Sequence, residues 1–241
     1  MATISLCMIV KNESAVLARC LDSIADLMDE IIIVDTGSTD NTKEIAAQYT
    51  SRIYDFKWTS DFSAARNFSF SKATMEYIYT ADADEILDDA NRERFLRLKD
   101  ALLPEIEIVQ MKYVTQGTFD TVLNAKKEYR PKLFRRLRTF TWIDPIHETV
   151  RLTPVTFDSD VEILHCPQSL HSKRDFSIFI KAFEHDGQFS PKIRTMYAKE
   201  LLKTGDKKDF TDAKPIFQLI FDNDPADDAR KEAACVLARI Y

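Results

Sequence analysis

Residues 30–40 read Glu30-Ile-Ile-Ile-Val-Asp35-Thr-Gly-Ser-Thr-Asp40, an apolar run that ends in a polar turn. The run shows no alternation, as expected of a parallel strand that is buried on both faces. A helix start follows the turn, because Asn41 with Glu44 three residues later resembles a capping box. The stretch therefore predicts a strand, a turn and a helix at 42–49, which together form a repeating unit of a parallel α/β sheet.

The same alternation continues on both sides of this unit. Further strands are expected at 4–10, 53–56 and 77–80, and helices at 16–27 and 62–71. Strands that alternate with helices indicate βαβ units and a sheet covered on both faces. The predicted fold class is therefore α/β, with three layers and a mostly parallel sheet.

The second half of the chain has a different pattern. Strand-like segments at 107–115 and 130–137 predict antiparallel strands added at the edge of the sheet. The following segments are helical, so we expect an α/β domain at 1–170 and a helical extension at 171–241. Part of that extension has the spacing of half a tetratricopeptide unit, at Ala213, Phe217 and Pro225. The extension either begins a series of such repeats or caps the α/β domain.

Composition excludes several classes of protein. The 241 residues are 45% hydrophobic, which is enough for a core, and carry a net charge of −6, which disfavours nucleic-acid binding. No apolar run is long enough to span a bilayer, and the first residues read as a strand rather than a signal peptide. The four cysteines are far apart and form no zinc or disulfide pattern. We expect a cytoplasmic protein without a transmembrane segment.

The four glycines form neither of the standard glycine-rich loops that bind nucleotide phosphates. The stretch Tyr77-Ile-Tyr-Thr-Ala-Asp82-Ala-Asp84-Glu85 offers an alternative, because a strand runs into two carboxylates. In extended backbone Asp82 and Asp84 project to the same side, at the edge where open α/β sheets bind ligands. A hard divalent cation held there could neutralise a diphosphate. The other interpretations are a solvated acidic turn and a haloacid-dehalogenase-type phosphatase, whose pattern Glu85-Ile86 fits poorly.

Two further residues are candidates for ligand contacts. The strand at 30–34 delivers Asp35 to the same edge, where a carboxylate can accept a proton from a nucleotide base or ribose. Asp35 could instead cap a helix, or be the phospho-acceptor of a receiver domain, although Val10-Lys11-Asn12 lacks the acidic partners of a receiver. Arg66, in the helix at 62–71, could contact a phosphate or the base, or could simply be solvated.

Taken together and in order, these motifs resemble family 2 glycosyltransferases with the GT-A fold. The residues that carry the resemblance are Ser5 to Glu13, Val34 to Asp40, Ala65 to Asn67 and Asp82 to Asp84. The similar subgroup is that of bacterial lipopolysaccharide-core β-1,4-glucosyltransferases, and related chains carry tetratricopeptide repeats after the catalytic domain. The resemblance covers roughly residues 3–170 and implies inverting transfer of a sugar from a nucleotide-sugar, most simply a UDP-sugar.

The resemblance also implies roles for the residues that bind the donor. Ile9, Val10 and Glu13 would line the nucleotide pocket mostly by backbone contacts. Asp35 would bind uracil or its equivalent, and Arg66 would approach the base or the diphosphate. The metal would be Mn²⁺ or Mg²⁺, held by Asp84, with Asp82 at the ribose or the metal and His165 as a further ligand.

Inverting transfer needs a base on the acceptor side, and Trp142-Ile-Asp144-Pro-Ile-His147-Glu148 supplies the candidates. We expect Glu148 to be the base, with Asp144 as the second choice and a structural or orienting role as the alternative. The acceptor would be a glycan, a lipid-linked sugar or a peptide. The basic run from Lys126 to Arg138 either meets an anionic acceptor or lipid headgroup at the membrane surface, or forms the solvent face of an edge strand.

Two other functions remain possible at this stage. A degenerate transferase domain could serve as a non-catalytic platform for a helical repeat, although Asp35, Asp82 and Asp84 are all present. A nucleotidyltransferase would need a glycine-rich, basic loop after the first strand, which Lys11-Asn12-Glu13 does not supply.

Overall fold

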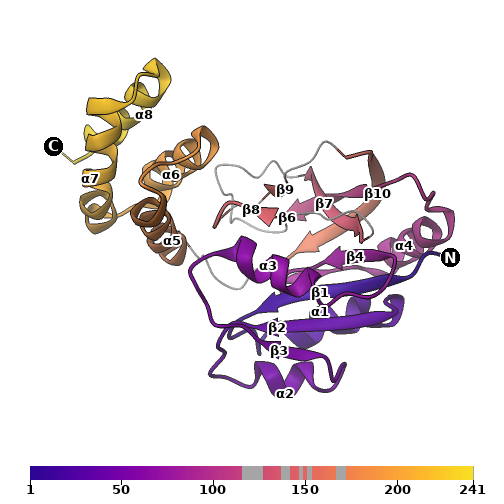
Figure 1. Cartoon of the computed structure of the whole chain (residues 1–241). Coiled ribbons are helices and arrows are strands. Elements are labelled where there is room, and N and C mark those ends of the chain that lie inside the picture. The colour runs from indigo at the N-terminus through magenta and orange to yellow at the C-terminus, as the bar shows by residue number, and fades with distance from the viewer. Residues whose placement is uncertain (116–126, 137–141, 147–148, 151–153, 167–171, 241) are drawn as a thin grey trace. The chain divides into compact units, whose positions relative to one another are not determined.

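The computed structural model describes residues 1–115, 127–136, 142–146, 149–150, 154–166 and 172–240 (Figure 1). The chain forms two compact units. The first holds the sheet and contains most of residues 1–169, and the second holds the C-terminal helices together with Ser60–Ser63 and the stretch that begins at Asp144. The predicted domain boundary at residue 170 remains a prediction. No helix in these ranges is long and apolar enough to cross a membrane.

The first unit is built on one large mixed sheet. In chain order its strands are β1 Ile4–Val10, β2 Glu30–Asp35, β3 Ile53–Asp55, β4 Tyr77–Thr80, β5 Glu85–Ile86, β6 Ile108–Thr115, β7 Lys127–Arg135 and β10 Thr156–His165. Their order in the sheet is β3-β2-β1-β4-β7-β6-β10-β5. The part β3-β2-β1-β4 is parallel, as predicted, whereas β7 is antiparallel to both its neighbours. A separate antiparallel pair is formed by β8 Trp142–Ile143 and β9 Thr149–Val150.

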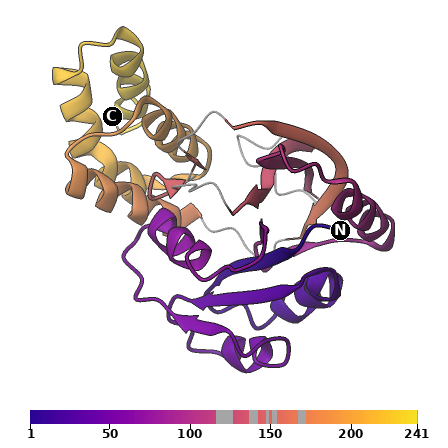
Figure 2. The same cartoon turned by 45° about the vertical axis from the view of Figure 1, so that its right-hand side comes forward.

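Helices cover both faces of the parallel part, which Figures 1 and 2 show from two sides. They are α1 Leu17–Ile24, the short 3₁₀ helix Ala25–Leu27, α2 Thr42–Ala46, α3 Phe62–Phe70 and α4 Asp89–Ala101. Leu6 and Met8 of β1 are fully buried in the core that includes residues of α1, α2 and α4, while Cys7 between them packs on the other face with residues of α3. The period-two alternation of a strand therefore supplies both cores, and the predicted three-layer α/β fold is confirmed.

The position of β7 corrects one interpretation of the sequence. The basic run was expected either to meet an anionic partner or to form the solvent face of an edge strand, but β7 lies between β4 and β6. Lys132 within it is buried, as are its neighbours Leu133 and Phe134. β7 is therefore a central strand and not an edge strand, and the solvent-face interpretation fails for its buried residues 132–134.

The second unit contains the helices α5 Ser172–Asp186, α6 Pro191–Thr204, α7 Lys207–Asn223 and α8 Asp227–Leu237. Their starts follow ordinary capping chemistry: Ser190 caps α6 with Pro191 as the first helical residue, and Asp206 with Asp209 forms a capping box for α7. Tyr197 is fully buried at the centre, stacked on Phe179 with 4.7 Å between ring centroids. These helices therefore enclose an aromatic core of their own.

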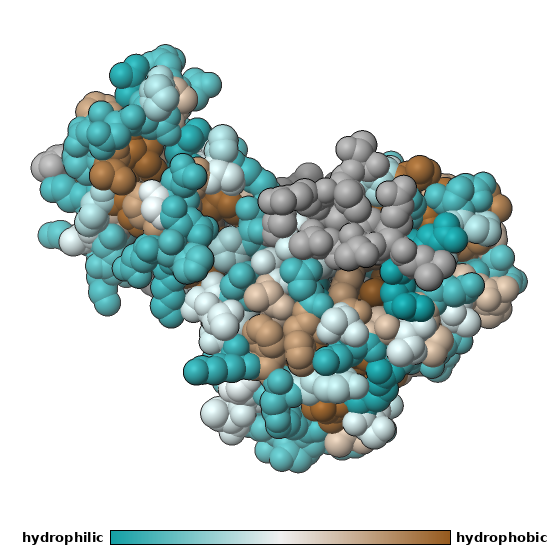
Figure 3. Space-filling view, viewed as in Figure 1, coloured by the Kyte–Doolittle hydropathy of each residue, from teal (hydrophilic) through white to brown (hydrophobic). Residues whose placement is uncertain are grey.

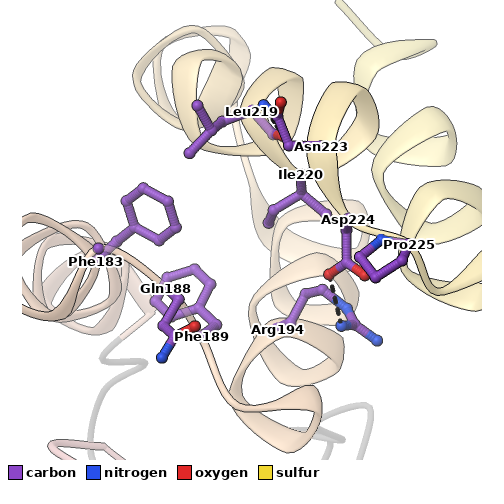
Figure 4. Close-up of a pocket in the computed structure, with 10 residues that line it drawn as sticks. Phe183, Gln188, Phe189, Arg194, Leu219, Ile220, Asn223, Asp224 and Pro225 are labelled. Carbon is purple, nitrogen blue, oxygen red and sulfur yellow. Dashed lines mark hydrogen bonds and ion pairs between the residues drawn. The ribbon is translucent and has the colours of Figure 1, made fainter.

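The helical unit also exposes apolar side chains. Figure 3 shows hydrophobic side chains at its surface, and its exposed large hydrophobic residues are Leu202, Leu219 and Phe221. A cavity of about 280 Å³ lies between Phe183 and Phe189 on one side and Leu219 and Ile220 on the other (Figure 4). None of the residues that the sequence singled out for chemistry lines this cavity.

Candidate active site

The candidate site lies at the carboxyl ends of the parallel strands. Val10, the last residue of β1, is in register with Asp35, the last residue of β2. The turn with Asp82 and Asp84 directly follows β4, which pairs with β1 on its other side. Because parallel strands end at the same edge of a sheet, three polar segments that are distant in the sequence meet there.

Asp35 is held in a fixed orientation. Its side chain is buried, with the residue 2% exposed, and its Oδ1 accepts hydrogen bonds from the backbone N–H groups of Gly37 and Ser38, each at 2.9 Å. Gly37 has a φ of 103°, a conformation that glycine adopts without strain. The other oxygen, Oδ2, is buried and has no hydrogen-bond partner within the residues described. A buried acceptor without a donor costs free energy, so Oδ2 of Asp35 is available to accept a hydrogen bond from a ligand.

The end of β1 is tied to the loop that follows β2. The carbonyl oxygen of Val10 accepts from the backbone N–H of Thr36, and the N–H of Glu13 donates to the Thr42 hydroxyl at 2.7 Å. Ile9 is partly buried beside the core on the α3 side of the sheet. The structure therefore places Ile9, Val10 and Glu13 next to the Asp35 turn, and their contact with a nucleotide remains a prediction.

The two carboxylates after β4 have different surroundings. The N–H of Glu85 donates to the carbonyl oxygen of Asp82 at 3.1 Å, so the segment is a turn and not an extension of the strand. The Asp82 side chain is 53% exposed and its Oδ1 lies 3.9 Å from the guanidinium of Arg66. The Asp84 side chain is 20% exposed and its Oδ2 lies 3.0 Å from Nε2 of His165. The expectation that Asp82 and Asp84 project to the same side assumed an extended backbone, and that assumption is wrong because the backbone turns here.

His165 reaches Asp84 through strand pairing. It is the last residue of β10, which is antiparallel to β5, and His165 is in register with Glu85. The N–H of Cys166 donates to the carbonyl oxygen of Asp84 at 2.9 Å. The imidazole packs on the ring of Tyr113, with centroids 5.0 Å apart, and its buried Nδ1 has no hydrogen-bond partner in the described part of the chain. Position 165 is thus fixed by backbone pairing as well as by ring packing.

The residues present fit a divalent metal in part. Oδ2 of Asp84 and Nε2 of His165, 3.0 Å apart, are an oxygen donor and a nitrogen donor of the kind that Mn²⁺ accepts. Across the described ranges, however, no three Asp, Glu, His or Cys side chains are grouped to hold a metal. The predicted set Asp82, Asp84 and His165 therefore does not form a complete protein-only centre, and the pair Asp84 and His165 would need oxygens from a ligand.

Positive charges surround the acidic turn. Removal from water raises the pKa of the Asp82 carboxyl, but the charges of Lys132, Arg66 and Arg130 lower it by more, so its pKa lies below the usual value. The guanidinium of Arg66 stacks on the Trp142 ring at 4.8 Å. Asn67, the next residue of α3, accepts from the backbone N–H of Trp142 at 2.8 Å and donates to its carbonyl oxygen at 3.0 Å. Arg66 is therefore held by the helix that carries it and by the strand against which it packs.

Sequence reasoning missed a buried ion pair directly below this turn. Lys132 Nζ lies 2.5 Å from Oε1 of Glu85, and the two side chains are 7% and 2% exposed. Burial raises the pKa of Glu85 to about 7, and the charge of Lys132 only partly offsets this effect. The one signal in the sequence was a lysine directly before the apolar pair Leu133-Phe134, which is unusual for a solvent-facing run.

The predicted acceptor-side residues are not among those grouped at this edge of the sheet. Asp144 belongs to the second unit, has a φ of 71° and lies 3.8 Å from Lys192 of α6. Glu148 and His147 lie outside the described residues. The choice of Glu148 as the base, with Asp144 as the second candidate, remains a prediction.

Several known proteins are similar to this chain. A TPR repeat-containing protein of Synechococcus elongatus is 48% identical over 87 residues, which is 36% of this chain and 22% of that protein. The SPbeta prophage-derived glycosyltransferase SunS of Bacillus subtilis is 33% identical over 132 residues, 53% of this chain and 31% of that protein. The chain thus spans less than a third of the length of these two relatives.

Solved structures and a family model complete the comparison. Glucosyl-3-phosphoglycerate synthase from Mycobacterium tuberculosis, crystallised with Mn²⁺, UDP-glucose and phosphoglyceric acid, superposes with a TM-score of 0.54 at 16% identity, covering 79% of this chain and 82% of that one. This likeness confirms the predicted fold. The family model described as Glycosyl transferase family 2 matches residues 5–153, well over half of the chain. The chain therefore belongs to glycosyl transferase family 2.

Proposed function

We propose that this chain transfers a sugar from a UDP-sugar to a glycan, lipid-linked or peptide acceptor, with a divalent metal and with inversion at the anomeric carbon. The observation that carries the proposal is the buried, unpartnered Oδ2 of Asp35, at the same edge of the sheet as the pair Asp84 and His165. A base-binding carboxylate and a metal-binding pair at one edge are what a nucleoside diphosphate requires. The synthase crystallised with Mn²⁺ and UDP-glucose shares the fold and supports this assignment.

Different residues then bind different parts of the UDP-sugar. Oδ2 of Asp35 accepts a hydrogen bond from the imide N–H of uracil, and Asp82 accepts hydrogen bonds from the ribose hydroxyls. Arg66 lies beside Asp82, where its guanidinium can meet the diphosphate. Asp84 and His165 would hold Mn²⁺ or Mg²⁺, which when bound would supply positive charge to the departing diphosphate. This arrangement stabilises the negative charge that develops as the sugar leaves.

The acceptor side is assigned by the family resemblance. Inversion needs a base on the face opposite the leaving group, and we propose Glu148 for this role, with Asp144 as the second candidate. The acceptor is a glycan, a lipid-linked sugar or a peptide. A Glu148→Gln variant should lose transfer and keep UDP affinity, whereas a loss of UDP affinity would point to donor binding.

A donor screen tests the proposal directly. Hydrolysis of nucleotide-sugars by the purified protein should occur with UDP-sugars and depend on Mn²⁺ or Mg²⁺. Asp84→Asn should remove the metal dependence together with the activity, while Asp82→Asn should mainly weaken donor binding. If neither hydrolysis nor a thermal shift with UDP and Mn²⁺ is seen, the chain is a non-catalytic module and the proposal is wrong.

A further inference from the structure

The buried pair of Lys132 and Glu85 joins two parts of the sheet that are not neighbours. Lys132 lies on β7 and Glu85 on β5, and the sheet places β6 and β10 between them. Nζ of Lys132, which contacts Glu85, lies 5.5 Å from the ring centroid of Tyr113, a residue of β6. The pair therefore links the central strand β7 to the short segment that follows the acidic turn.

Stability alone does not account for this pair. Two charges removed from water can lose more free energy of hydration than their attraction regains, and apolar residues of similar volume are often as stable or more so. Here one Glu85 oxygen, Oε2, is also buried and has no partner within the described ranges, which adds a cost. An arrangement that costs free energy at this position calls for a role other than stabilising the fold.

Its neighbours indicate what that role is. Glu85 directly follows Asp84 in the chain and is in register with His165 across the β5–β10 ladder. The Glu85 side chain points into the core while Asp84 contacts the imidazole of His165 at 3.0 Å. The position of residue 85 therefore affects both Asp84, its neighbour in the chain, and His165, its partner across the ladder.

We propose that Lys132, by holding Glu85 in the core, is a positioning residue that keeps Asp84 and His165 in contact for the metal of the donor complex. The inference rests on the proposed function, because it assigns Lys132 to the metal site. Among the described residues the Lys132 ammonium donates to Glu85 and not to Asp82 or Asp84, so we expect it to act through Glu85.

Two variants test the proposal. Lys132→Met leaves Glu85 buried without its cation, so the side chain loses its anchor, and the affinity for Mn²⁺ in the presence of UDP should fall by roughly 10- to 100-fold. The double variant E85L/K132M replaces the pair with apolar side chains that keep residue 85 in the core. Its Mn²⁺ affinity should be within about threefold of that of the wild-type protein. That loss is smaller than the loss of at least about tenfold expected for Lys132→Met.

A matched control separates positioning from stability. Lys99 is also buried, at 7% exposure, and lies 2.6 Å from Asp29, whose N–H donates to the carbonyl oxygen of Ile4 at the opposite end of β1. Lys99→Met should lower the unfolding temperature without changing Mn²⁺ affinity. Unchanged Mn²⁺ affinity in Lys132→Met would overturn the proposal, as would a double variant that stays as weak as the single one, since Lys132 would then act on the donor directly.

One further measurement tests the positioning of His165 separately from the proposed function. The imidazole nitrogen resonances of His165 in the metal-free protein report its contact with Asp84. They should shift in Lys132→Met, return in the double variant and stay unchanged in Lys99→Met. Failure of the wild-type protein to bind Mn²⁺ and UDP would refute the proposed function, while His165 resonances that ignore Lys132 would refute the positioning role.

Discussion

Replacing Asp35 with Asn should change which nucleotide the protein prefers. Oδ1 of Asp35 accepts two backbone N–H groups at 2.9 Å, so the atom in that place must remain an acceptor. In Asp35→Asn the carbonyl oxygen therefore takes the Oδ1 position, and the NH₂ group takes the buried position of Oδ2. A group that could only accept becomes one that can only donate.

The expected magnitudes follow from this exchange. Two charge-assisted hydrogen bonds become neutral ones, which costs about 1–2 kcal/mol of stability in total. Uracil offers an imide N–H at this point, so UDP loses a charge-assisted bond and meets a second donor instead. A loss of about 2–4 kcal/mol corresponds to roughly 30- to 700-fold weaker binding. Cytosine offers an acceptor at the same ring nitrogen, so CDP should keep a bond to the new NH₂ group.

Isothermal titration calorimetry with UDP and CDP measures the ratio of the two affinities. The ratio should fall by at least about 30-fold in Asp35→Asn, the lower end of the same range. Asp40→Asn is the matched control, because both Asp40 oxygens already have partners, the backbone N–H of Ser14 on one and that of Thr42 on the other. An Asp35→Asn protein with an unchanged ratio would show that Oδ2 does not face the base.

Two other predictions concern stability. Removal from water raises the pKa of Asp40, but hydrogen bonds from Ser14 and Thr42 lower it by more, to about 2 from 3.8. The stabilising contribution of Asp40 should therefore be complete above about pH 4 and lost as the pH falls towards 2. The free energies of unfolding of the wild-type protein and Asp40→Asn, measured by chemical denaturation, should converge over that range. A Cβ at Gly205 would lie 2.6 Å from the carbonyl oxygen of Leu201, so Gly205→Ala should destabilise the helical unit by about 1–3 kcal/mol. UDP titration should be unaffected by Gly205→Ala, and an unchanged unfolding transition would show that the backbone adjusts.

Much of the fold could be predicted because its signals are local. The strand expected at 4–10 is β1, and the buried run at 30–34 is β2 with one more residue. The helix expected at 62–71 is α3, Phe62–Phe70. The helix after β2 ends at Ala46, earlier than the expected residue 49. The period of the apolar residues indicates which face of each segment is buried. The ends of helices and strands are less certain because they depend on caps and turns.

The pairing of distant segments could not be predicted in this way. His165 and Asp84 are separated by 81 residues and meet only because β10 pairs with β5. Lys132 is buried only because β7 enters the sheet between β4 and β6. Sequence patterns say that a strand exists and which face is apolar, but the order of strands in a sheet depends on contacts between segments far apart.

The turn after β4 also explains why two neighbouring carboxylates should have different tasks. Asp82 is already balanced by the protein, because Lys132, Arg66 and Arg130 all favour its charged form. Asp84 contacts an imidazole instead, and its neighbour Glu85 takes the direct contact with Lys132. Because the lysine is engaged in the core by Glu85, Asp84 meets a nitrogen ligand and not a competing ammonium group. This contrast supports the proposed assignment of the metal to Asp84 and of the ribose to Asp82.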